Sequence, residues 1–137
     1  MADKLTPEHR SENMRRIKSK GTKPEMLVRR LVHGMGYRYR LHSPDLPGKP
    51  DLVFPSRRKV IFVHGCFWHL HGDPNCPDRR GPRTNRDYWK PKLARNRQRD
   101  AEHITALEIA GWSVLTVWEC ETRDPATVVA SVRAFLE

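Results

Sequence analysis

Residues 50–64 read PDLVFPSRRKVIFVH, and this stretch decides the fold that we expect. Two apolar runs, at residues 50–54 and 59–64, flank a turn at 55–58, which is the pattern of two neighbouring β-strands. The second run is apolar almost throughout and suits a central strand whose two faces are both covered. Asp51 stands at the start of the first run, so a carboxylate is expected where the two strands diverge.

Further elements are predicted on both sides of this pair. A capping box at residues 22–25 precedes a helix whose apolar face carries residues 27–35, and Gly34 and Gly36 end that helix. The remaining elements are a weak basic helix at 6–20, a strand at 37–41, a long charged helix capped by Thr84 with Asp87 that runs to about residue 110, a strand at 112–118 and a helix at 127–136. This order predicts an α/β fold, a single domain over residues 1–137 with a mixed β-sheet flanked by helices.

The charge balance indicates the class of partner. The chain has 137 residues, with 26 Lys and Arg against 16 Asp and Glu, so its formal net charge is +10. Nucleic acid is the expected partner, because neutralising phosphates releases counterions and drives binding. We expect no membrane contact and a cytoplasmic location, because the sequence has no apolar stretch near ~18 residues and its N-terminus is too polar for a signal peptide.

The carboxylate of Asp51 is a candidate ligand for Mg²⁺, which prefers oxygen ligands. A backbone carbonyl on the neighbouring strand, such as that of Val63, could supply a second oxygen. Taken alone, the pair Pro50-Asp51 is more often a simple turn, so this interpretation depends on the residues that follow.

All three cysteines of the chain, together with one histidine, form a candidate zinc site, namely Cys66, His71, Cys76 and Cys120. Three thiolates and one imidazole are a usual ligand set for tetrahedral structural zinc. Buried free thiols and a core histidine are the alternative, which is weaker for four residues than for one. A site with four protein ligands is closed, so this zinc is expected to hold the loop together.

Two histidines and two aromatic residues in the same stretch remain after the zinc ligands are assigned. His64 or His69 could accept a proton from water near pH 7, although such a histidine more often lies behind a metal ligand or on the surface. Phe67 and Trp68 could stack on or wedge between bases, or could pack beneath the loop. The residues alone leave both alternatives open.

Four blocks of sequence together resemble one enzyme family. In chain order they are RSENMRRI at 10–17 with Thr22 and Glu25, LPGKPD at 46–51, VIFVHGCFWH at 60–69 and GWSVLTVWEC at 111–120. By these blocks the chain is similar to the very-short-patch repair (Vsr) endonucleases. The resemblance implies a restriction-endonuclease-like fold with a structural zinc site. It also implies a Mg²⁺-dependent enzyme that nicks one DNA strand 5′ of the T in a T·G mispair, which arises when 5-methylcytosine deaminates.

The resemblance also implies roles for the catalytic residues. Asp51 would bind Mg²⁺ together with the main-chain oxygen of Val63, and His69 would activate the attacking water. His64 would assist at the scissile phosphate, and Glu25 would reach the metal-bound water. This chain has Val63 where the family carries threonine, which leaves a main-chain contact possible and removes any side-chain role. Glu25 is also the expected capping partner of Thr22.

DNA recognition is assigned by the same resemblance. Phe67 and Trp68 would enter beside the mismatch from the major groove, and Met14, on an N-terminal arm at residues 1–20, would enter from the minor groove. The expected partner is mismatched double-stranded DNA, with functional links to a DNA cytosine-5 methyltransferase and a repair polymerase. A monomer is expected, since one nick needs one active site. The alternatives are a restriction-type or junction nuclease of the same fold and a nonenzymatic zinc-stabilised DNA-binding module.

Overall fold

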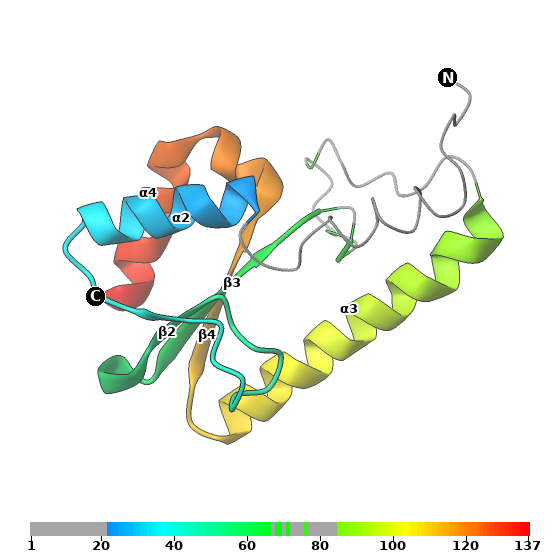
Figure 1. Cartoon of the computed structure of the whole chain (residues 1–137), viewed down its shortest axis with the longest axis horizontal. Helices are drawn as coiled ribbons and strands as arrows, with labels where there is room; N and C mark the ends of the chain where they lie inside the picture. The colour runs from blue at the N-terminus through cyan, green and yellow to red at the C-terminus, as the bar shows by residue number, and fades with distance from the viewer. Residues whose placement is uncertain (1–21, 67, 70, 72–75, 77–84) are drawn as a thin grey trace.

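A four-stranded sheet with helices on both faces forms the centre of the protein (Figure 1). The computed structural model describes residues 22–66, 68, 69, 71, 76 and 85–137. The strands β1 (Arg40–Leu41), β2 (Leu52–Phe54), β3 (Lys59–His64) and β4 (Ser113–Trp118) lie side by side in this order. The pairs β1–β2 and β2–β3 are antiparallel, whereas β3–β4 is parallel. The predicted α/β fold with a mixed sheet is confirmed, and β3 is an internal strand as expected.

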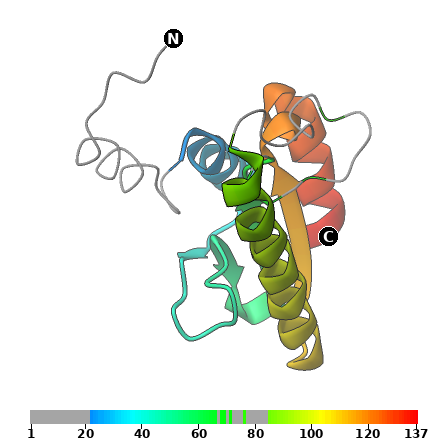
Figure 2. The same ribbon diagram turned by 90° about the vertical axis from the view of Figure 1, so that its right-hand side faces the viewer.

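The two faces of the sheet bury two separate apolar clusters. Helices α2 (Lys23–Gly34) and α4 (Pro125–Leu136) cover one face, and the long helix α3 (Arg86–Ile109) crosses the other (Figures 1 and 2). Side chains alternate along β3, so that Ile61 packs toward α2 and α4 while Val60 and Phe62 pack toward α3. This alternation explains why residues 59–64 are apolar almost throughout, since both faces are covered.

Helix α2 begins as the sequence predicts. Thr22 is the N-cap, and its hydroxyl oxygen accepts a hydrogen bond from the main-chain N–H of Glu25 at 3.3 Å. The Glu25 carboxylate faces His42 and Arg29, with its Oε2 at 2.8 Å from His42 Nε2 and 3.6 Å from Arg29 Nη1. The Glu25 side chain therefore has partners away from the helix N-cap.

Several predicted boundaries were wrong for identifiable reasons. The strand predicted at 37–41 is reduced to Arg40–Leu41, because the N–H of Tyr37 bonds to the carbonyl of Val32 at the end of α2. Helix α3 has Asn85 as its N-cap, at a left-handed φ of 53° and with no side-chain cap, so Thr84 is not the cap. Cys120 lies just beyond β4, in a 3₁₀ helix at Glu119–Arg123 that the sequence pattern did not reveal.

Some expectations fall outside the described residues, including Met14, the arm at residues 1–20 and Phe67. Among the residues that are described, no helix has the length and apolar character needed to cross a membrane.

Candidate active site and metal centre

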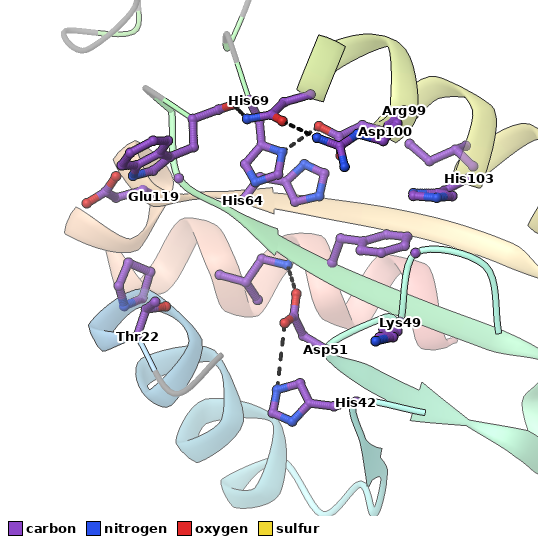
Figure 3. A pocket seen from close by; sticks show the side chains of 18 of the residues that line it. Thr22, His42, Lys49, Asp51, His64, His69, Arg99, Asp100, His103 and Glu119 are labelled. Atoms are coloured by element: carbon purple, nitrogen blue, oxygen red, sulfur yellow. Dashed lines mark hydrogen bonds and ion pairs between the residues drawn. The ribbon is translucent and has the colours of Figure 1, made fainter. Parts of the chain in front are cut away.

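A cleft of about 1080 Å³ opens where the end of β3 faces the start of α2 and one side of α3 (Figure 3). Residues far apart in the sequence line it, from Thr22 on one wall to Ile104 on the other. Acidic and basic side chains share this lining, namely Asp51, Asp100, Glu119, Lys49, Lys92 and Arg99. A cleft with both signs of charge can hold cations and phosphates together.

Asp51 lies where strands β2 and β3 stop pairing. The last pair toward this end is Leu52↔Ile61, and beyond it the main-chain N–H of Val63 donates to Asp51 Oδ2 at 2.7 Å. The N–H and C=O of one strand residue point to the same side, so the Val63 carbonyl also faces the Asp51 side. The structure thus brings together the carboxylate and the carbonyl that were expected to share a metal ion.

The environment of Asp51 suits a cation. Burial raises the pKa of Asp51 to about 7, the hydrogen bond from Val63 acts in the opposite direction, and the nearby Glu25 raises the pKa further. Two buried acids side by side disfavour each other's ionised form, and a nearby positive charge reverses that effect. The donor set of buried carboxylates with a carbonyl oxygen fits Mg²⁺.

His42 belongs to the same group, although the sequence analysis did not single it out. One side-chain ligand atom from each of Glu25, His42 and Asp51 lies within 4.8 Å of the others. His42 Nε2 is 2.8 Å from Glu25 Oε2 and 3.8 Å from Asp51 Oδ1. The main-chain N–H of His42 also donates to the carbonyl oxygen of Asp51 at 3.2 Å.

His64 and His69 lie on the other side of the cleft, with their rings stacked at 3.8 Å and 7°. Burial, followed by the proximity of His69, lowers the pKa of His64 to about 4, so this ring is neutral near pH 7. His69 Nδ1 makes a close hydrogen-bonding contact with Asp100 Oδ2. A carboxylate only accepts hydrogen bonds, so Nδ1 carries the hydrogen and His69 Nε2 is left able to accept a proton.

The four predicted zinc ligands come together as one cluster. The ligand atoms of Cys66, His71, Cys76 and Cys120 all lie within 4.8 Å of one another. His71 Nδ1 is 3.6 Å from Cys66 Sγ and 3.4 Å from Cys120 Sγ. Tetrahedral zinc with bonds of ~2.3 Å to sulfur and ~2.0 Å to nitrogen would place these atoms roughly 3.5 Å apart. The cluster therefore has the composition and the spacing of a structural zinc site.

Trp68 lies in the cleft wall and is half-buried. Its ring meets Trp89 of α3 edge-on at 5.5 Å, and the side chain of Asn96 donates to its carbonyl oxygen at 3.3 Å. Lys92 Nζ lies 5.8 Å from the centre of the Trp89 ring. Trp68 is therefore partly exposed, and its ring contacts Trp89, which lies on a helix distant from it in the sequence.

The sequence analysis missed Asp100 and Trp89 as well as His42. A polar stripe on α3, with Lys92, Asn96, Asp100 and His103 spaced by four, four and three residues, faces the cleft and was the available signal. No comparable periodicity marks His42, because it lies in the loop before Asp51.

Comparison with known proteins gives the family. The family described as DNA mismatch endonuclease Vsr matches residues 2–75. The type II nicking enzyme V.XorIIP of Xanthomonas oryzae pv. oryzae is 50% identical over 137 residues, covering 100% of this chain and 98% of that protein. The DNA mismatch endonuclease Vsr of Escherichia coli (strain K12) is 42% identical over 123 residues, covering 90% of this chain and 77% of that protein. Together with the four sequence blocks, these matches show that the chain belongs to the Vsr family of DNA mismatch endonucleases.

Proposed function

We propose that this protein is a Mg²⁺-dependent endonuclease that nicks one strand of DNA 5′ of the T in a T·G mispair. The proposal is supported by one observation on this member of the Vsr family: Asp51 and Val63 lie in the same cleft as the His69–Asp100 pair. Nicking there would start very-short-patch repair of deaminated 5-methylcytosine, in the bacterial cytoplasm and together with a cytosine-5 methyltransferase and a repair polymerase.

The reaction is the hydrolysis of one phosphodiester bond. Asp51 and the main-chain oxygen of Val63 would hold Mg²⁺, which when bound polarises the phosphate and stabilises charge on the leaving oxygen. His69 Nε2 takes a proton from water, the water oxygen forms a bond to phosphorus, and the bond to the leaving oxygen breaks; that oxygen takes a proton from solvent and leaves as a hydroxyl group. Asp100 holds the His69 ring in the required tautomer and stabilises it once it is protonated. Because a metal contact at residue 63 would use the main chain, valine there would preserve it.

His64 has a different part in this scheme. Its pKa of about 4 keeps it neutral, so it assists at the scissile phosphate as a hydrogen-bonding ring and not as a cation. Its stacking against His69 also fixes the plane of that ring. Glu25 is buried behind the cleft and contacts His42, from where it would reach the metal-bound water.

The proposal also assigns a structural role to the Cys–His cluster and a DNA-binding role to the aromatic residues Phe67 and Trp68. Zn²⁺ at Cys66, His71, Cys76 and Cys120 would hold the loop that carries His69 and Trp68. Phe67 and Trp68 would enter the mispair from the major groove and Met14 from the minor groove, because a mispair costs less to unstack than a matched pair. We further propose a restriction-endonuclease-like core, one domain over residues 1–137 with an N-terminal arm at 1–20, and a monomer.

The first prediction tests the reaction. Purified protein should nick the T strand of a T·G duplex only with Mg²⁺, and should leave the matched T·A duplex intact. Asp51→Asn should remove nicking and retain duplex binding, while Asp45→Asn, an exposed aspartate of the same loop, should behave as wild type. Equal cutting of both duplexes would instead indicate a restriction-type nuclease. Binding without any cutting would indicate a DNA-binding module.

The second prediction concerns the proton acceptor. His69→Ala should lower the single-turnover nicking rate by ~10²–10⁴-fold, the usual contribution of a general base. Asp100→Asn should also lower it, and the double variant should be no slower than His69→Ala, because Asp100 acts through His69. Glu102→Gln, an exposed acid on the same helix, is the matched control. Additive losses in the double variant would remove Asp100 from this role.

The third prediction concerns zinc. Elemental analysis should find one Zn²⁺ for each chain, and Cys120→Ser should lose both the metal and much of the free energy of unfolding. The physical reason is that the ligands come from distant segments, so metal binding stabilises the fold. His33→Ala, an exposed histidine far from the cluster, should retain zinc and stability. A protein equally stable after complete zinc removal would contradict the assignment.

The fourth prediction separates a mismatch wedge from a packing residue. Trp68→Ala should lower the preference for T·G over T·A duplex by roughly 1–3 kcal/mol, the value of one stacked aromatic, and should leave the salt dependence of binding unchanged. Trp112→Ala, a half-buried tryptophan outside the cleft lining, should lower the melting temperature without changing this preference. A large melting loss in Trp68→Ala with unchanged discrimination would mean that Trp68 only packs.

A further inference from the structure

Two acidic side chains lie together at the cleft, Asp51 in its lining and Glu25 buried behind it, and their burial raises the question of what holds them in place. Glu25 is 1% exposed and Asp51 is 8% exposed, and their nearest carboxylate oxygens share one group with the ring of His42. Carboxylates this close repel each other when both are ionised. A donor between them therefore has a direct effect on their arrangement.

His42 is the side chain in that position. Its Nε2 lies 2.8 Å from Glu25 Oε2 and 3.8 Å from Asp51 Oδ1, while its main-chain N–H donates to the Asp51 carbonyl. Figure 3 shows the His42 ring beneath Asp51, on the loop that leads into β2. The ring thus connects an acid of helix α2 with the acid that directly precedes strand β2. Arg29 also approaches Glu25 Oε2, but at the longer distance of 3.6 Å.

The backbone of His42 adopts a conformation that few residues take. Its φ is 45°, in the left-handed region, which few non-glycine residues adopt and in which asparagine, aspartate and histidine are enriched. Gly48 and Lys49 of the same loop also have positive φ values, of 74° and 48°. Residues kept in such conformations gather at functional sites. The turn at His42 lets its amide and its ring face the same aspartate.

We propose that His42 is a positioning residue of the catalytic site, whose Nε2–H holds the Glu25 carboxylate beside Asp51 so that the two acids are arranged for the cation. His42 acts through these carboxylates. This inference rests on the proposed Mg²⁺ chemistry, yet it concerns a residue for which the resemblance implies no role. Hydrogen-bonding partners of this kind typically change metal affinity by about tenfold to hundredfold when they are removed.

The sharpest test compares two amide replacements. The amide nitrogen of glutamine in His42→Gln reaches about as far as Nε2 of histidine, whereas that of asparagine in His42→Asn is one methylene shorter. Asparagine, however, suits the left-handed backbone better than glutamine does. A purely structural role for residue 42 therefore predicts that His42→Asn is at least as good as His42→Gln. The positioning role predicts the opposite, namely that His42→Gln keeps more of the metal affinity than His42→Asn.

Each variant is measured in two ways, in addition to a thermal melt. His33→Ala serves as the control for replacement of a histidine. The first is the binding of Mn²⁺ to zinc-loaded protein by isothermal titration in the absence of DNA. The second is the Mg²⁺ concentration that gives half-maximal nicking of a T·G duplex. His42→Ala and His42→Asn should weaken Mn²⁺ binding and raise the Mg²⁺ requirement by about tenfold or more. His42→Gln should restore most of both, and duplex binding by the zinc-loaded protein without added Mg²⁺ or Mn²⁺ should not change.

The outcomes separate this inference from the proposed function. Unchanged Mn²⁺ binding and Mg²⁺ requirement in His42→Ala would overturn the positioning role, as would a His42→Asn variant that matches wild type while His42→Gln does not. If His42→Ala does not fold, the comparison of glutamine with asparagine still decides. Absence of T·G nicking by the wild type would contradict the proposed function alone, because the Mn²⁺ titration without DNA still tests His42.

Discussion

The end of the pairing between β2 and β3 is the constraint on which the site depends. Beyond Leu52 and Ile61 the N–H of Val63 has no strand partner on that side, and a buried donor left unsatisfied costs about 1–3 kcal/mol. The carboxylate of Asp51 satisfies this N–H, so the residue that would hold the cation also completes the hydrogen bonding of the sheet. The main chain of β3 therefore fixes the position of the Asp51 carboxylate, which lines the cleft.

The parallel register of β3 and β4 likewise places two members of the Cys–His cluster. The last pair is His64↔Trp118, and Cys66 and Cys120 each follow two residues later. The two cysteines therefore leave the sheet side by side, and His71 reaches both while its ring stacks on Trp118 at 4.1 Å. Strand pairing thus brings the cluster together, next to the chain segment that carries Trp68 and His69.

Helix α3 contributes more side chains to the cleft than to the buried core. Of its 24 residues only Leu93 and Leu107 are buried, although the helix crosses a whole face of the sheet. The side that faces the cleft brings Asp100 to His69 and Trp89 to Trp68. A helix so polar would be marginal by itself, and its packing against the sheet lets it present functional side chains at fixed spacing.

The sequence by itself determined the main elements, the mixed α/β class, the family resemblance and most of the candidate metal-ligating residues. These follow from local periodicity and from rare motifs, such as the apolar run at residues 59–64 and the cysteines around His71. Only the tertiary structure showed that β1 is short, that Glu25 turns toward His42, and that Asp100 and Trp89 complete the cleft. The physical reason is that these side-chain contacts join residues 17 to 31 positions apart through strand register and helix packing, which local sequence patterns do not encode.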